Sequence, residues 1–160
     1  MASTQANAAP TGAPLSVAQI RANQNFALAV PAGLVAALAG AILWAAVVYF
    51  THVKLGLIVV AVGVLVGYAI RAAGNGVDQK FGILGGACAA LGWALGTALT
   101  DVAFLAQGAG RPALDVVQAL SATQIAALMA RAADPMDLLF LAIAVWEGYK
   151  FSFKYKLKAK

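Results

Sequence analysis

Three long apolar runs dominate this chain, and each of them contains several glycines. They cover residues 26–50, 55–71 and 82–105. Glycine is a poor helix former in water, but a bilayer tolerates it because no water competes for the backbone and small residues let helices approach closely. The first run holds twenty-five residues without a charge, enough to cross a hydrocarbon core of about 30 Å. The pattern therefore predicts membrane-spanning helices.

Short polar turns separate the three runs and set their directions. Residues 51–54 form a loop so short that the next helix must return antiparallel. The second run is short, but it still spans if Arg71 extends its charged group to the lipid head groups. The sequence Gly-Asn-Gly at 74–76 is a strong turn signal before the third run.

Residues 114–133 mix apolar and polar positions and differ from the runs before them. Ile125, Leu128 and Met129 recur at the spacing of one face of an amphipathic helix. Ser121 is a candidate N-cap inside the segment, which is compatible with two short helices. We expect an interfacial segment that covers the outer end of the bundle; the sharper alternative is a lid or a partner-binding surface.

The last apolar stretch, 138–146, is too short to cross a membrane by itself. It becomes a fourth span, 136–155, if the helix continues through Glu147 and Lys150. Four spans would place eight of the eleven basic residues on one side. Since basic residues favour the cytoplasmic side, the count predicts four spans with both termini in the cytoplasm. The eight residues are Arg21, Arg71, Lys80, Lys150, Lys154, Lys156, Lys158 and Lys160.

The composition agrees with a membrane location. Hydrophobic residues make up 62% of the 160 positions and charged residues 11%, which is too little charge to cover a soluble protein of this size. Residues 1–25 have the composition of a flexible tail, with room for a short interfacial helix. Residues 26–156 form the membrane domain, and 157–160 form a basic tail. We expect this tail to contact anionic lipid rather than nucleic acid, because it follows a membrane helix.

Small residues spaced four apart form GxxxG patterns on the second and third spans. Such spacing clears a strip of helix for close backbone contact, but it does not distinguish packing within one chain from packing between subunits. Its concentration on these two spans predicts that they form the tight core. The helix-packing glycines are Gly63, Gly67, Gly82, Gly86, Gly92 and Gly96.

Glu147 is the most interesting ionisable residue. A helix that starts at Met136 places it roughly 17 Å along the helix axis, just past the middle of the bilayer core. An ionisable group at that depth is a functional candidate, so Glu147 and Lys150 form a candidate ion or proton site. The alternative that we favour is a local ion pair between Glu147 and Lys150, with the lysine extended toward the cytoplasmic surface.

No catalytic constellation is visible in the sequence. The single histidine, His52, lies in a polar turn, and the single cysteine, Cys88, lies in an apolar run. Asp101 and Asp137 share one end of the bundle, but Glu147 lies at another level, which argues against a shared acid–base site. We therefore expect no enzymatic activity, catalytic residue, metal or cofactor.

Several stretches of the chain resemble a group of small, largely uncharacterised bacterial inner-membrane proteins. The resemblance rests on GAILW at 40–44, VGVLVGYAIR at 62–71, the GNG turn at 74–76, FGILGG at 81–86, a glycine-rich segment at 91–99 and DLLFLAIAVWEGYK at 137–150. It implies a multi-span bacterial membrane protein and implies no activity, cofactor or site residue.

These observations together predict an all-α integral membrane bundle of four transmembrane helices, with an amphipathic interfacial segment between spans three and four. The leading function is a structural or accessory subunit that packs through its glycine-rich faces, in a homo-oligomer or against a partner membrane protein. The alternative is a small oligomeric ion channel or transporter with Glu147 near the conduction path.

Overall fold

The computed structural model describes residues 17–52, 56–132 and 134–154, and every regular element in these ranges is an α-helix. Most of the predicted N-terminal tail, the turn residue Lys54 and the basic tail 157–160 lie outside the described residues. The seven helices of the described ranges are α1 (Val17–Ala22), α2 (Phe26–Thr51), α3 (Gly56–Gly74), α4 (Gln79–Ala109), α5 (Ala113–Ala119), α6 (Ala122–Ala132) and α7 (Pro135–Phe151).

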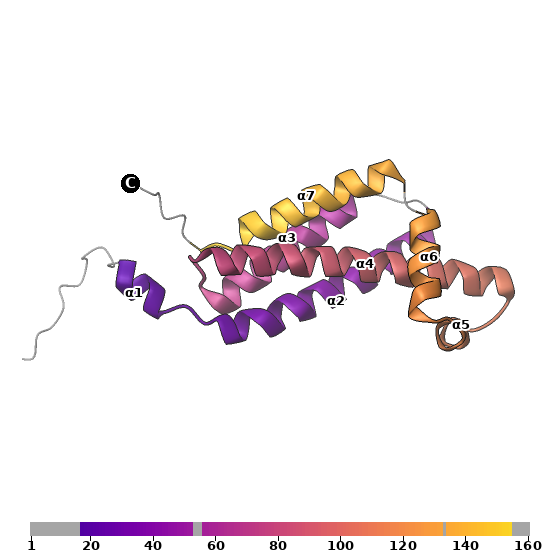
Figure 1. The fold of residues 1–160 in the computed structure, drawn as a ribbon, viewed down its shortest axis with the longest axis horizontal. Helices are drawn as coiled ribbons and strands as arrows, with labels where there is room; N and C mark the ends of the chain where they lie inside the picture. The colour runs from indigo at the N-terminus through magenta and orange to yellow at the C-terminus, as the bar shows by residue number, and fades with distance from the viewer. Residues whose placement is uncertain (1–16, 53–55, 133, 155–160) are drawn as a thin grey trace, which may run out of the picture.

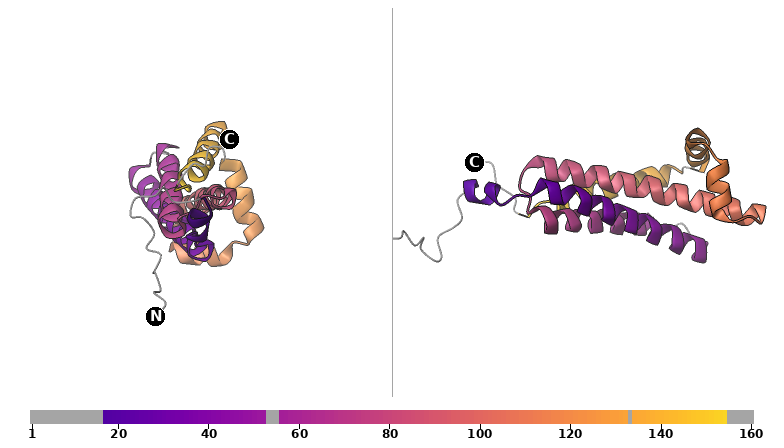
Figure 2. Two further views of the ribbon diagram at one scale, coloured as in Figure 1. Left: turned by 90° about the vertical axis from the view of Figure 1, so that its left-hand side faces the viewer. Right: turned by 90° about the horizontal axis from the view of Figure 1, so that it is seen from below.

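Four of these helices, α2, α3, α4 and α7, run lengthwise beside one another and alternate in direction (Figure 1). The view along the bundle shows them clustered around a common axis (Figure 2, left). The short α1 and the last turn of α7 lie at one end of the bundle, and α5 and α6 lie at the other (Figure 1). We call these the α1 end and the α5–α6 end.

Capping residues explain where α2 begins and ends. The side chain of Asn25 accepts a hydrogen bond from the backbone N–H of Leu28 at 3.1 Å, which satisfies one of the unpaired donors of the first turn. At the other end His52 adopts a left-handed conformation with φ of 56°, and its N–H donates to the carbonyl of Val48. The helix therefore covers nearly the same residues as the predicted span 26–50.

The bounds of α4 and α7 differ from those that we predicted. The helix α4 runs from Gln79 to Ala109, beyond both ends of the predicted span 82–105, and stops where Gly110 takes the left-handed conformation that glycine accepts readily. The helix α7 ends at Phe151 instead of residue 155. After Phe151 the chain leaves the helix, and the N–H of Lys154 donates to the carbonyl of Gly76 at 2.8 Å.

Among the described residues, three helices are long and apolar enough to cross a membrane: α2, α3 and α4. The protein thus has the features of a membrane protein. The 17 residues of α7 are fewer than those of any of these three helices. The helices α5 and α6 meet at a bend of 110°, so they would count as one broken span at most.

The segment between α4 and α7 consists of two helices, as the candidate cap at Ser121 indicated. The Oγ of Ser121 accepts from the N–H of Gln124 at 3.3 Å, and the Oε1 of Gln124 accepts from the N–H of Ser121 at 2.8 Å. This reciprocal pair is a capping box at the start of α6. Val116 of α5 packs against Val102 and Ala106 of α4, so α5 covers the last turns of α4.

The interior of the bundle is filled by two apolar clusters. One lies toward the α1 end and includes Val66, Ile70 and Phe81, which are completely buried. The other lies toward the α5–α6 end and joins Trp44 and Val48 of α2 to residues of α3 and α7. The outer faces carry large exposed apolar side chains, among them Val35, Leu43, Leu57, Leu138 and Trp146, as expected for surfaces in contact with lipid.

Candidate functional site

The six predicted packing glycines are all buried inside this chain. Gly63 and Gly67 on α3 face α7: a Cβ at Gly63 would lie 2.9 Å from the Cα of Ala144, and one at Gly67 would lie 3.1 Å from the carbonyl oxygen of Gly148. Gly82 and Gly86 on α4 also face α7, against Tyr149 and Val145 respectively. These contacts place α7 in the groove between α3 and α4.

Of the other two glycines of α4, Gly96 faces α2, and Gly92 lies between α2 and α3, where a Cβ would be 3.2 Å from a methyl carbon of Val62. A Cβ at Gly92 would lie 3.3 Å from the carbonyl oxygen of Ala37, and one at Gly96 would lie 2.6 Å from the indole ring of Trp44. The GxxxG spacing therefore marks contacts of α3 and α4 with α7 and α2. We expected from the sequence that the second and third spans form the tight core; the contact of Gly92 with Val62 joins these two spans, and the other five glycines pack against α7 or α2.

Glu147 forms an ion pair with Lys150 one turn later on α7. The distance between the carboxylate oxygen Oε1 and the ammonium nitrogen Nζ is 3.9 Å, and the two side chains are 19% and 42% exposed. The ammonium group also lies 5.4 Å from the centre of the Phe151 ring. The geometry is that of the local pair that we favoured from the sequence.

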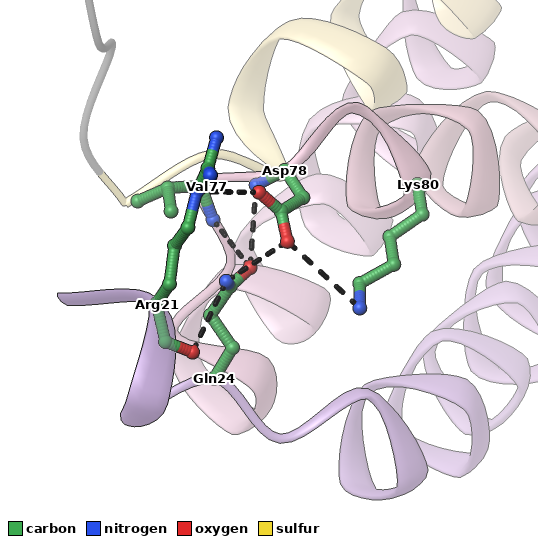
Figure 3. A network of polar contacts seen from close by, with 5 residues as sticks. All are labelled: Arg21, Gln24, Val77, Asp78 and Lys80. Atoms are coloured by element: carbon green, nitrogen blue, oxygen red, sulfur yellow. Dashed lines mark hydrogen bonds and ion pairs between the residues drawn. The ribbon is translucent and has the colours of Figure 1, made fainter. Parts of the chain in front are cut away.

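A polar network at the α1 end was not visible in the sequence. The side-chain oxygen of Gln24 accepts hydrogen bonds from the backbone N–H groups of Val77 and Asp78, at 3.1 and 3.2 Å. Its amide nitrogen donates to the Asp78 carboxylate at 3.0 Å and to the carbonyl of Arg21 at 3.2 Å. Figure 3 shows this side chain between α1 and the turn before α4. We call this network of hydrogen bonds the Gln24 clamp.

Two cations complete the Gln24 clamp. Arg21 approaches one oxygen of Asp78 at 3.3 Å, and Lys80 approaches the other at 3.9 Å (Figure 3). The arginine and lysine side chains are more than half exposed, so these ion pairs add little stability individually. The hydrogen bonds of Gln24 matter more, because they satisfy backbone donors in a partly buried turn.

Lys154, the last residue that the structure describes, also stabilises the turn at 74–76. The Nζ of Lys154 donates to the side-chain oxygen of Asn75 at 2.6 Å, in addition to its backbone bond to Gly76. Asn75 has a φ of 48°, a conformation that asparagine accepts. Gly76 has another role: a side chain there would overlap the ring of Phe81.

At the α5–α6 end, a small pocket lined by several polar side chains lies between α2, α4 and α7. We call it the Trp44 pocket. Its two acidic residues, Asp101 and Asp137, come from α4 and α7, so the structure brings together two carboxylates that are 36 positions apart in the sequence. The pocket is lined by Trp44, Val48, Thr97, Thr100, Asp101 and Asp137.

Two polar atoms of the Trp44 pocket lack hydrogen-bond partners among the described residues: Nε1 of Trp44 and Oγ1 of Thr97. Both atoms are buried, and an unpaired buried donor costs about 1–3 kcal/mol. Thr100 differs, because its hydroxyl donates to the carbonyl of Gly96 at 2.8 Å. Asp137 accepts from the N–H of Asp134 at 3.2 Å and thereby caps α7.

The two residues that occur once in the sequence lie apart from these sites. Cys88 is buried in the apolar cluster near the α1 end. His52 caps α2, and its ring lies 5.7 Å from that of Phe104. No group of three or more potential metal-ligating side chains occurs among the described residues.

Comparison with protein families, with curated proteins and with solved structures finds no match to this chain. The resemblance to small bacterial inner-membrane proteins is therefore untested and stays a hypothesis.

Proposed function

We propose that this chain is a four-span protein of the bacterial inner membrane that serves as a non-enzymatic structural or accessory subunit. The observation that carries the proposal is the close contact of helix backbones at glycines, as between Gly63 and Ala144 or Gly148 and Gly85. Such contacts join the four lengthwise helices into one tightly packed unit. The outer faces then become the surfaces on which the protein meets its partners.

The position of α7 supports a fourth span. Its first part contacts the beginning of α3, where Phe140 lies against Gly56, and Lys154, just after the end of α7, reaches the turn at Gly76. The helix thus returns from the α5–α6 end to the α1 end beside three apolar helices (Figure 1). Its 17 residues rise about 26 Å, and Lys150 at its last turn is long enough to reach the head groups.

The distribution of charge supports cytoplasmic termini. At the α1 end, Arg21 and Lys80 belong to the Gln24 clamp and Lys154 bonds Asn75. Arg71 and Lys150 lie in the last turns of helices that end there. Arg111 and Arg131 belong to the opposite, α5–α6 end. The rule that basic residues favour the cytoplasm then places the α1 end inside the cell, next to anionic lipid.

The length of α4 supports an interfacial position for α5 and α6. Its 31 residues rise about 46 Å, whereas the hydrocarbon core is about 30 Å thick. Val102 and Ala106, which α5 covers, lie in the last turns of α4. With the start of α4 near the cytoplasmic surface, these residues lie beyond the core, so α5 and α6 rest at the outer interface.

A groove between α4 and α7 is the surface that we propose for a partner helix. It has a volume of about 590 Å³ and is almost entirely apolar. Gly82 and Gly86 line it together with the exposed Ala87 and Ala142. Small residues let a further membrane helix approach closely, so two of the predicted packing glycines also border a surface open to a second copy or a partner membrane protein.

The test is the oligomeric state in a membrane-like environment. Ala87→Phe and Ala142→Phe fill the groove without entering the interior, because both side chains are exposed. We expect either change to release the partner in native mass spectrometry of nanodiscs while the helix content is kept. Ala61→Phe, on an exposed position of α3 outside the groove, is the matched control. An assembly that survives both groove variants would defeat the proposed surface.

The alternative is a channel or transporter with Glu147 near the conduction path. The ion pair with Lys150 satisfies the charge of Glu147 locally, which weakens this alternative. The channel alternative can be tested directly. Glu147→Gln should leave ion flux into liposomes unchanged if Glu147 acts only in the ion pair with Lys150. A change in flux, with assembly intact, would favour the channel.

A further inference from the structure

The Trp44 pocket contains two buried polar groups that take part in neither the glycine contacts nor the proposed groove. Trp44 is 6% exposed and lines the pocket, and its Nε1–H has no hydrogen-bond partner among the described residues. The hydroxyl of Thr97, on α4, is also buried without a hydrogen-bond partner among the described residues. These two groups come from facing helices, so one small ligand between them would satisfy both.

The size of the pocket limits this ligand. The centre of a water-sized sphere can move through about 10 Å³ of it, which is the room that one water molecule needs. A larger organic molecule does not fit into this space. The pocket is lined by Asp101 in the second half of α4 and Asp137 in the first turn of α7. It therefore lies toward the α5–α6 end, which the proposed orientation places at a water interface.

The chemistry of the lining selects water rather than a cation. The indole N–H is a donor only, a carboxylate is an acceptor, and a hydroxyl is both. A metal ion would meet the positive end of the Trp44 N–H dipole, whereas water accepts from that group and donates to a carboxylate. We propose that one buried water molecule occupies the Trp44 pocket, accepts from Trp44 Nε1–H, and links it to Thr97 and the carboxylates of Asp101 and Asp137.

This water would connect three helices through polar contacts. Trp44 belongs to α2, Asp101 to α4 and Asp137 to the first turn of α7. Asp137 already fixes the start of α7 through its bond from the Asp134 N–H. The water therefore positions the start of α7 against α2 and α4, at the end opposite the Gln24 clamp.

The experiment observes the water and the indole group separately, in the full-length protein in nanodiscs. Infrared difference spectra in H₂¹⁶O and H₂¹⁸O detect an ordered water as an O–H band that shifts with the isotope. We expect this band in the native protein, its loss in Trp44→Phe, and its retention in Trp146→Phe, because Trp146 is 62% exposed on the outer face.

The second measurement uses a Trp93→Phe/Trp146→Phe variant, in which Trp44 is the sole tryptophan. Its ultraviolet Raman spectrum should show a hydrogen-bonded indole N–H. A free indole N–H, or the absence of any isotope-sensitive band that depends on Trp44, would show a dry pocket and overturn the proposal. Bands that change when sodium replaces choline in the buffer would also overturn it, in favour of a cation site.

Discussion

Gly63 on α3 lies directly against the backbone of Ala144 on α7. A Cβ built on Gly63 would lie 2.9 Å from the Ala144 Cα and would overlap its carbonyl oxygen. Unlike the end of a flexible side chain, a helix backbone cannot move aside alone. The α3–α7 contact therefore depends on the absence of a side chain at position 63.

We expect Gly63→Leu to push α7 away from α3 and to destabilise the bundle by about 1–3 kcal/mol or more, as overpacked cores do. Ala61→Leu on the same helix is the control, because Ala61 is exposed. Thermal unfolding in detergent, followed by circular dichroism, compares the two. If both variants melted at the same temperature, the α3–α7 contact would not have the geometry described.

The long spans are predictable because a bilayer restricts the backbone to structures that satisfy their own hydrogen bonds. A run of twenty-five uncharged residues must satisfy its backbone internally, and α2 indeed begins at Phe26 and ends at Thr51. The end of α7 was less predictable. Lys154 turns back to Gly76, and this contact joins two positions that are far apart in the chain.

The partners of the glycines and the polar sites were not predictable for the same reason. GxxxG spacing indicates that one face of a helix lacks large side chains, but not which helix packs against that face. Gly96, for example, packs against Trp44. Gln24 and Asp78 are separated by 54 positions, so no local pattern connects them. The sequence did indicate that Asp101 and Asp137 share one end, but not that they line one pocket with Trp44.

The Gln24 clamp gives a second prediction. Gln24→Ala leaves the N–H groups of Val77 and Asp78 without their acceptor, and we expect a loss of about 1–3 kcal/mol in the local stability of this turn. Hydrogen exchange at residues 74–78 should become faster.

The control for the clamp is Gln79→Ala, an exposed glutamine at the start of α4. It removes the same kind of side chain next to Asp78 and two residues from Val77, the bonded donors of the turn, and we expect little change in exchange. Equal acceleration in both variants would mean that the clamp contributes no specific protection.

The capping box of α6 gives a third prediction. Ser121→Ala removes the acceptor for the Gln124 N–H, and N-cap losses of this kind cost about 1 kcal/mol. We expect faster hydrogen exchange in the first turn of α6 and unchanged exchange in α2. Gln118→Ala, at an exposed position of α5, serves as control. Unaltered exchange at Gln124 in the Ser121 variant would contradict the cap.

The proposed topology can be tested with single cysteines. Cys88 is buried and is replaced by alanine, and one cysteine is then placed at an exposed position: Gln79, Ala126 or Lys154. With four spans and cytoplasmic termini, a membrane-impermeant maleimide should label Ala126→Cys in spheroplasts, and Gln79→Cys and Lys154→Cys only after the membrane is permeabilised. Mass spectrometry measures the labelled fraction.

The position of Lys154 distinguishes four spans from three. Gln79 is the first residue of α4 and Ala126 follows α4 in the sequence, so they label from opposite sides whether or not α7 crosses the membrane. Lys154 follows α7, and it labels with Gln79 only if α7 spans. Labelling of Lys154→Cys together with Ala126→Cys would exclude the fourth span. A complete reversal of the pattern would retain four spans and invert the orientation, so that the basic α1 end would face outward against the charge rule.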